Sequence, residues 1–573
     1  MRCLGRILPR SESIVTVGNG PYAVRLSVPI MRVKAGGITH FRAALPTRMF
    51  SSHRAKDSSG QMHFCKHILL VSAGFLAGGC STIQQPAPAD AGPPAIDALQ
   101  LLDRISWGAS PASIREIRRV GADRYLAHQL KPGAQPALPA VVEDQIEATN
   151  TAGKTPFQLA AELDAQRRAA DALANDEDKK AARQTYQQEL TRIGRESMRR
   201  TLLRAVYSPH QLQEQMTWFW FNHFNVYQFK ANLRALIGDY EDSAIRPRAL
   251  GRFGDMLKAV VHHPAMLIYL DNVRNAAGRI NENFARELME LHTLGVNGGY
   301  TQQDVQELAR ILTGVGVNID PKQPRLRPAL QPYYVREGLF EFNPNRHDFG
   351  DKLFLGTRVR CAGLDEVDAA LDQLARHPST ALFIATKLAT FFLADAPPPA
   401  LIARIAGVFE RSDGDIAATL AALFATPEFA ASLGRKFKDP MHYVISAVRM
   451  TAEDGPVADA GLLINWLNRM GQPLHGRQTP DGYPLGGAAW ASPGQMATRF
   501  EIARAIGGGG GAPVRRGQEP ATGRAAAPQL ENVVFDDLLQ ARLSAPTREA
   551  LVQAGSQREW NIFLLASPEF MLH

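Results

Sequence analysis

Two segments of the sequence place ionisable side chains on the apolar face of a predicted helix. In residues 211–224 (QLQEQMTWFWFNHF), helical spacing puts His223 on the face shared by the large apolar side chains. In residues 280–295 (INENFARELMELHTLG), Glu287 falls within the apolar face and Glu290 lies beside its edge. These residues need partners, because an unpaired buried carboxylate costs several kcal/mol or shifts its pKa.

This set of residues has two interpretations. In the functional one, His223, Glu287 and Glu290 converge on a divalent metal ion or act as general acid and base. In the structural one, His223 is a hydrogen-bonded core histidine and Glu287 forms a buried ion pair with an arginine. The candidate arginines for that pair are Arg234, Arg246 and Arg310. Further candidate binding residues flank the second helix or lie in loops: Asn283, His292, His347, Asp348 and Trp490.

Several standard catalytic signatures are missing from the sequence. It contains no H-E-x-x-H, no G-x-S-x-G and no G-x-x-x-x-G-K-[ST]. These absences argue against the common zinc-peptidase, serine-hydrolase and P-loop classes. The five glycines that open residues 507–528 follow no predicted strand, so we interpret this stretch as a flexible insert and not as a nucleotide-binding loop.

The positive net charge of the 573-residue chain is confined to its first 61 residues. The formal net charge is +8, and residues 1–61 contain ten basic and two acidic side chains. Residues 62–573 contain 54 of each kind and are neutral overall. The body of the protein therefore has no charge excess that would favour nucleic acid as a partner.

Residues 62–80 have the pattern of a bacterial lipoprotein signal peptide. A short basic start at Met62 is followed by twelve apolar or small residues, 68–79, and then by Cys80. A membrane-spanning helix needs about 20 residues, so the apolar run is too short to cross a bilayer. We expect Cys80 to carry the lipid, residues 81–97 to form a Pro/Ala-rich tether, and residues 1–61 to be a mis-annotated or disordered leader.

From residue 98 onward the pattern predicts a mainly α-helical globular body with long Gly/Pro-rich loops and little or no sheet. Ser-Pro or Thr-Pro pairs, which favour helix starts, recur at Ser110, Ser208, Thr426, Ser492 and Ser567. Residues 157–206 mix both charge signs, as expected for one or two exposed helices. A boundary near Cys361 divides the body into two predicted packed lobes, residues 98–360 and 361–573.

Several long motifs resemble one bacterial family. They are NENFARELMELHTLGVNGGY, RHDFGDKLFLG, MGQPLHGRQTPDGYP and the terminal LLASPEF. Together they are similar to the bacterial domain-of-unknown-function family 1800 over nearly all of residues 98–573. The resemblance implies a large, mainly helical exported protein, often encoded beside an exported protein of sulfatase-like fold, and it brings no assigned reaction. At 481–484 this chain has Asp-Gly-Tyr-Pro where the family usually has Gly-Trp-Pro.

Two functions from different classes follow. The first is a lipoprotein of the cell envelope, at the outer membrane or facing the periplasm. It is held to the membrane through Cys80, and its helical module binds a polymer or a partner protein such as a sulfatase-like one. The second is a hydrolase-like enzyme that depends on a metal or on carboxylates and uses His223, Glu287 and Glu290.

Overall fold

A computed structural model describes most of the chain from residue 97 onward. The described residues are 13–17, 24–28, 97–133, 138–360, 362–451, 457, 459–508 and 527–573. The predicted signal peptide with Cys80, the tether up to residue 96, residue 361 and most of the 507–528 insert lie outside them. Residues 1–87 and 88–573 are separate units. In the first unit, β1 (Ser13–Val17) pairs antiparallel with β2 (Val24–Val28).

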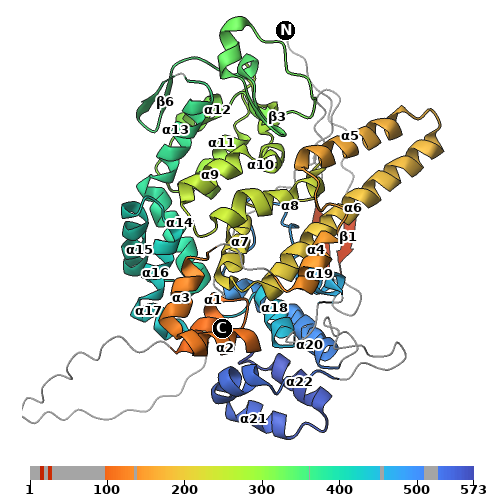
Figure 1. The fold of residues 1–573 in the computed structure, drawn as a ribbon, viewed down its shortest axis with the longest axis vertical. Coiled ribbons are helices and arrows are strands. Elements are labelled where there is room, and N and C mark those ends of the chain that lie inside the picture. Colours follow the sequence, from red (N-terminus) through yellow and green to blue (C-terminus); the bar gives the residue numbers. More distant parts are fainter. Residues whose placement is uncertain are drawn as a thin grey trace, which may run out of the picture. The chain divides into compact units, whose positions relative to one another are not determined.

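The second unit is mainly helical, as the sequence predicts (Figure 1). Its first helices are α1 (Ala98–Ile105), α2 (Pro111–Val120), α3 (Ala122–Leu130), α4 (Ala140–Glu147), α5 (Pro156–Ala172), α6 (Asp176–Tyr207), α7 (Gln211–His223), α8 (Ile237–Asp239), α9 (Phe253–His262), α10 (Pro264–Tyr269), α11 (Asn283–Glu287) and α12 (Gln302–Ile311). The later helices are α13 (Leu364–Ala375), α14 (Pro378–Phe392), α15 (Pro399–Arg411), α16 (Ile416–Phe424), α17 (Pro427–Ser432), α18 (Pro440–Thr451), α19 (Ala460–Arg469), α20 (Pro493–Gly507), α21 (Ala545–Val552) and α22 (Gln557–Ala566).

Short 3-10 and π segments and small sheets connect these helices. The short segments are η1 (Leu233–Ala235), η2 (Tyr240–Ile245), η3 (Arg246–Arg248), η4 (Asn272–Arg274), η5 (Leu288–His292), η6 (Pro328–Tyr333), η7 (Pro344–Arg346), η8 (Gly487–Trp490), η9 (Phe535–Leu539) and η10 (Gln540–Arg542). A three-stranded antiparallel sheet has the order β3 (Val315–Val317), β5 (Phe340–Phe342), β4 (Val335–Glu337), and β6 (Lys352–Phe354) pairs with β7 (Thr357–Val359).

The Ser-Pro and Thr-Pro pairs begin helices at three of the five predicted places. Ser110, Thr426 and Ser492 each cap a helix through a side-chain oxygen, with proline in the first turn. Ser208 instead ends α6, and α7 begins at Gln211. Ser567 is the C-cap of α22 and no helix follows it in the described chain. A Ser-Pro or Thr-Pro pair alone is therefore insufficient to begin a helix.

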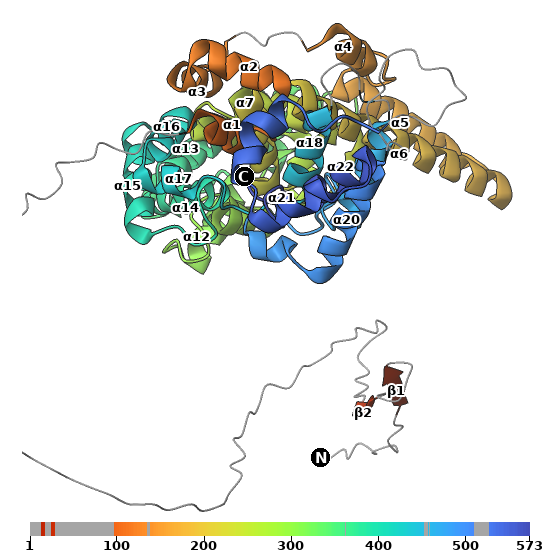
Figure 2. The same ribbon diagram turned by 90° about the horizontal axis from the view of Figure 1, so that it is seen from below.

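The helices of residues 88–573 share one apolar core. The antiparallel pair α5 and α6 extends beyond the rest of this unit in both views (Figures 1 and 2), as predicted for the mixed-charge stretch 157–206. Residues from the two ends of the unit meet: the guanidinium of Arg104 donates to the carbonyl oxygens of Phe392 and His573, both at 2.5 Å. The division into two lobes near residue 361 stays a prediction. No described helix is both long and apolar enough to cross a bilayer.

Candidate functional site

The end of α7 holds a loop from the C-terminal half of the chain, here named the 472–484 segment. The Asn222 side chain donates to the carbonyl of Tyr483 at 2.9 Å and accepts from its N–H at 2.6 Å. Asn225 donates to the carbonyls of Arg477 and Thr479, both at 2.9 Å. Four backbone groups of the segment are thus fixed by two asparagines at and just beyond the end of α7, and the segment brings charged residues to two clusters.

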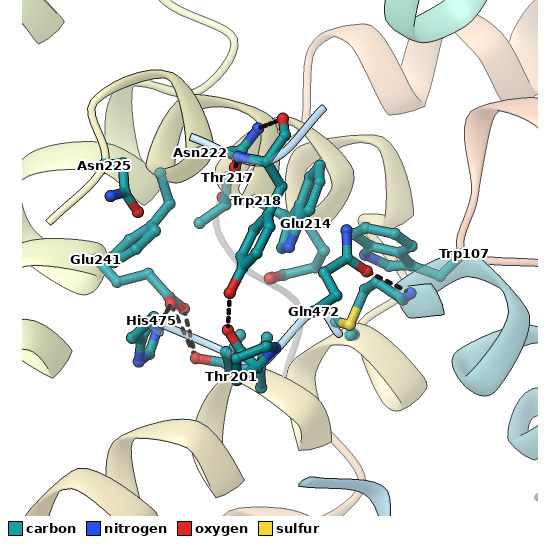
Figure 3. A pocket seen from close by; sticks show the side chains of 16 residues that line it. Trp107, Thr201, Glu214, Thr217, Trp218, Asn222, Asn225, Glu241, Gln472 and His475 are labelled. Carbon is teal, nitrogen blue, oxygen red and sulfur yellow. Dashed lines mark hydrogen bonds and ion pairs between the residues drawn. The ribbon is translucent and has the colours of Figure 1, made fainter. Parts of the chain in front are cut away.

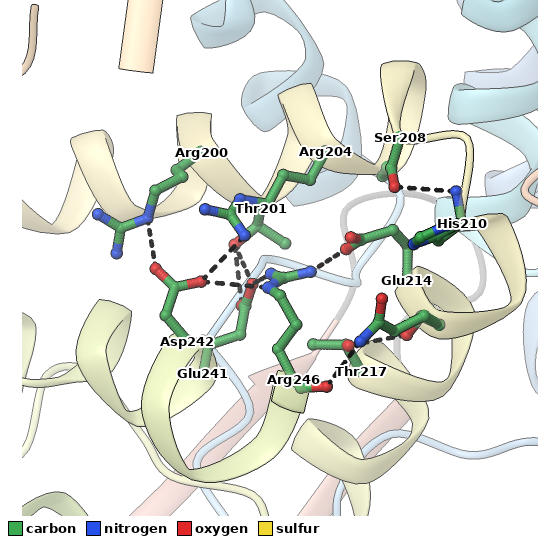
Figure 4. A network of polar contacts seen from close by, with 12 residues as sticks. Arg200, Thr201, Arg204, Ser208, His210, Glu214, Thr217, Glu241, Asp242 and Arg246 are labelled. Atoms are coloured by element: carbon green, nitrogen blue, oxygen red, sulfur yellow. Dashed lines mark hydrogen bonds and ion pairs between the residues drawn. The ribbon is translucent and has the colours of Figure 1, made fainter. Parts of the chain in front are cut away.

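The first cluster is centred on Arg246 (Figure 4), and the 472–484 segment contributes His475 to it. Arg246 forms ion pairs with Glu214 of α7 and Glu241 of η2, and all three side chains are buried. The carboxylate of Glu241 also accepts a hydrogen bond from Thr201 at 2.8 Å and lies 3.1 Å from His475 Nε2 (Figure 3). One guanidinium therefore holds two buried carboxylates that come from different elements.

The two carboxylates of this cluster have opposite pKa shifts. Burial raises the pKa of Glu214, and the charge of Arg246 only partly offsets that effect. Burial also opposes ionisation of Glu241, but the hydrogen bond from His475 and the charge of Arg246 outweigh it and lower its pKa to about 2. Glu241 is therefore the more readily ionised of the two carboxylates.

Beside this cluster lies a small cavity, lined by residues of α6, α7, η2 and the 472–484 segment (Figure 3). Trp107, Trp218 and Phe221 form much of its apolar wall. Its interior volume is about 20 Å³, which is enough for about one water molecule. The cavity is thus too small for an organic substrate, and the Arg246 cluster is a buried structural network.

The second cluster contains His223, which the sequence predicts as a candidate site residue. His223 is 1% exposed, its Nε2 lies 3.0 Å from the carbonyl oxygen of His292, and its Nδ1 lies 2.9 Å from Nζ of Lys387 in α14. A carbonyl oxygen only accepts, so Nε2 carries the proton and Nδ1 accepts from Lys387. Burial, and then the charge of Lys387, lowers the pKa of His223 well below its usual value, so the ring is neutral.

Burial also shifts the pKa values of the groups around His223. His292 is fully buried, and its pKa falls to about 3 because of burial and the nearby Lys387. Lys387 itself has a pKa lowered to about 8 by burial, an effect that the charge of Asp481 in the 472–484 segment partly opposes. This cluster therefore consists of two neutral imidazoles and one amine that loses its proton more easily than usual.

Glu287 and Glu290, the two glutamates predicted as site residues, are neighbours on the same helical segment, and neither is paired with His223. Glu290 lies 3.4 Å from Arg286, one turn earlier on the same helix. Glu287 is partly buried and has no ion pair or hydrogen bond among the described residues. Burial, and then the charge of Glu290, raises the pKa of Glu287. No hydrogen bond or ion pair joins either glutamate to His223 in the described chain.

The predicted arginine partners of Glu287 are wrong, since each has other contacts. Arg234 donates to Gln187 and Thr191, Arg246 belongs to the cluster of Figure 4, and Arg310 pairs with Glu307 and Asp348. The core-histidine part of the structural interpretation agrees with the contacts of His223. Within the described residues, no group of three or more His, Cys, Asp and Glu side chains is placed to hold a metal ion. The structure therefore does not bring His223, Glu287 and Glu290 together as metal ligands.

The histidine of the RHDFGDK motif takes part in a buried contact, and its aspartate takes part in a partly exposed ion pair. His347 Nε2 and Lys352 Nζ both lie 2.6 Å from the same oxygen of Glu366, and all three side chains are fully buried. Asp348 pairs with Arg310 at 2.8 Å, which holds its pKa at about 2. This motif therefore joins the β6 strand and α13 to the loop before them.

The last two candidate binding residues also have structural contacts. Trp490 is 4% exposed, and its Nε1 donates to the carbonyl of Pro484 at 3.1 Å. Asn283 is exposed, yet its side-chain amide donates to the carbonyl of Leu270 at 3.0 Å. Both residues hold loops in place.

Sequence reasoning missed Lys387 and the Arg246 cluster. Lys387 is the only charged residue of α14 (PSTALFIATKLATFF), and a single lysine inside a long apolar run was an available signal. The Arg246 cluster had no local signal, because Glu214, Glu241 and His475 come from three separate elements.

Comparison with known proteins gives a family and no individual relative. No curated protein and no solved structure matches this chain significantly. Residues 100–572 match the model of the family described as "Protein of unknown function (DUF1800)". This match covers nearly the whole helical unit, and the protein belongs to that family.

Proposed function

We propose that this protein is an exported bacterial lipoprotein whose helical body binds a partner protein or a polymer in the cell envelope. The signal-like residues 62–80 with Cys80 support export and a lipid anchor at the outer membrane or facing the periplasm. The neutral body supports a partner other than nucleic acid. The sulfatase-like proteins implied by the family resemblance are candidate protein partners.

The observation that carries the binding role is an open groove between α2, α3, α4 and the turn from α6 to α7. Its volume is about 610 Å³, within the usual range of ligand sites. Nine of its eighteen lining residues are apolar or aromatic: Pro111, Ala112, Tyr125, Pro139, Val141, Val142, Val206, Tyr207 and Pro209. The other nine are polar or charged: Ser110, Ser113, Glu116, His128, Gln129, Ser208, His210, Gln211 and Arg449. A wall that mixes apolar surface with hydrogen-bonding groups suits an extended peptide or a polymer segment.

Three of the candidate site residues predicted from the sequence support the same conclusion. His223, His347 and Asp348 have their polar atoms in contacts within the fold. The cavity beside the Arg246 cluster holds about one water molecule, with a volume of about 20 Å³, whereas the groove is roughly thirty times larger. The space for a partner is therefore separate from these ionisable clusters.

Site-specific photo-crosslinking in the native host tests the binding role. A photoreactive amino acid replaces Val141, which is 46% exposed and lines the groove, or Val552, which is 86% exposed and does not. We expect a discrete adduct from position 141 that is absent from position 552. Ala112→Trp, which fills the groove from the exposed side of α2, is expected to abolish the adduct, whereas Ala181→Trp on α6 leaves it unchanged. Equal adducts from both positions, or none from position 141, would refute the groove as the binding site.

One observation favours a second function, a carboxylate-dependent hydrolase. Glu287 combines a raised pKa with the absence of a partner in the described residues, as expected of a general acid. The test is hydrolysis of chromogenic ester, phosphoester and glycoside substrates by the purified protein. Activity that is lost in Glu287→Gln and kept in Glu282→Gln would support this function. Here Glu282, which pairs with Arg286 at 3.0 Å, is the matched control.

A further inference from the structure

Lys387 has surroundings that differ from those of an ordinary surface lysine. Its Nζ donates to His223 Nδ1 at 2.9 Å, and no carboxylate of the described chain lies within 4.0 Å of it. The ring of Phe383, one turn earlier on α14, lies with its centroid 5.3 Å from Nζ. The side chain is only partly buried, and its amine contacts a neutral ring and an aromatic face.

His223 positions this amine. Its Nε2 proton is committed to the carbonyl of His292, so the lone pair of Nδ1 always points at Lys387. A neutral imidazole accepts a hydrogen bond from the amine without supplying a negative charge that would hold its proton. The groups that face Lys387 are His223 from α7, His292 from η5 and Asp481 from the 472–484 segment. Both imidazoles are neutral, and Asp481 is itself paired with Arg477 at 2.8 Å.

We propose that Lys387 is a covalent capture site for carbonyl compounds, in which its amine forms an imine with an unhindered aldehyde or ketone. The amine nitrogen attacks the carbonyl carbon, and a C=N bond replaces the C=O bond. The carbonyl oxygen leaves as water with the two amine protons, so the step needs no oxidant or reductant. A lysine desolvated beside an apolar surface is a recognised way to make such a nucleophile.

The fraction of Lys387 present as free amine determines how fast it forms an imine relative to an ordinary lysine. With a pKa of about 8, about a quarter of the side chains are free amine at pH 7.5, against about one in a thousand for a lysine at 10.5. A less basic amine is also a weaker nucleophile. For thiols, the logarithm of the nucleophilic rate constant falls by about 0.45 for each unit by which the pKa falls. With the same Brønsted coefficient for the amine, Lys387 should react roughly twentyfold faster than a lysine of ordinary pKa.

Reductive trapping with propanal tests this inference on the mature protein. Cyanoborohydride converts each imine to a stable secondary amine, and peptide mass spectrometry gives the rate at each lysine. We expect Lys387 to be labelled about twentyfold faster than Lys258 at pH 7.5, with a pH midpoint near 8. Lys258 is the accessible control, because its side chain is 30% exposed and pairs with Asp372 at 2.9 Å.

Two further measurements separate reactivity from mere exposure. Lys438 also has a pKa lowered to about 8, but it is 2% exposed, so we expect it to remain unlabelled in the folded protein. Asp481→Asn removes the charge that raises the pKa of Lys387, so it is expected to shift the midpoint to lower pH and speed labelling. The inference is overturned if Lys387 reacts no faster than Lys258, if its midpoint lies near 10, or if Asp481→Asn leaves its rate unchanged.

Discussion

Replacing Arg246 with methionine tests whether the buried charge cluster holds α7 and η2 together. The substitution removes the cation that pairs with Glu214 and Glu241, which are 7% and 3% exposed. Breaking one side of a buried pair costs about 3 to 5 kcal/mol. The direction agrees with the pKa of Glu241, which the hydrogen bond from His475 and then the charge of Arg246 lower to about 2.

This free energy translates into a measurable shift in melting temperature. An unfolding entropy of about 2.1 cal/mol/K per residue amounts to roughly 1 kcal/mol/K for residues 88–573. We therefore expect Arg246→Met to lower the Tm by about 3 to 5 °C at pH 7, measured by differential scanning fluorimetry. Arg248→Met is the matched control, because in the described chain Arg248 donates to the carbonyls of Ser243 and Ala244 within its own turn and forms no ion pair.

The same variant makes a prediction about pH. A carboxylate whose pKa is depressed by folding contributes stability above its unfolded value, and this contribution is lost as the pH falls toward the folded value. For Glu241 that window runs from about 4.5 down to about 2. The Tm difference between the wild type and Arg246→Met should therefore shrink in this range. A difference no larger than that of Arg248→Met, or one that is constant with pH, would refute the reasoning.

Three other substitutions test separate parts of the structure. Glu366→Gln should lower the Tm by several degrees, since it leaves Lys352 and His347 buried without their shared carboxylate, whereas the exposed Asp365→Asn should not. Glu287→Gln should leave the Tm at pH 7 unchanged or slightly higher and have no effect below about pH 4. A raised carboxyl pKa means that ionisation costs stability, and a lower Tm at pH 7 would contradict this. Gly482→Ala should speed hydrogen exchange in the 472–484 segment, because Gly482 has a φ of +75° and an added Cβ would overlap the carbonyl oxygen of Asn222. Unchanged exchange would contradict this.

The predictions that depended on local pattern agree with the structure more closely than those that depended on distant partners. Helical periodicity placed His223 on a buried face, where it is 1% exposed. The same argument put Glu287 on a buried face, but its side chain lies at the edge of the core and is only partly buried. The partner of His223 could not be predicted, because Lys387 lies 164 positions away and its contact depends on how α7 and α14 pack.

The sequence by itself determined the mainly helical architecture, the neutral charge of the body and the family. Capping pairs, apolar periodicity and long motifs are local properties that neighbouring residues specify. Only the tertiary structure decided which ionisable residues meet. Arg246 neutralises Glu214 and Glu241, Glu366 neutralises Lys352, and Lys387 has a neutral histidine in place of a carboxylate. The physical reason is that a buried charge is stabilised by whichever partner the packing of the core brings within a few ångströms, and sequence spacing does not encode that distance.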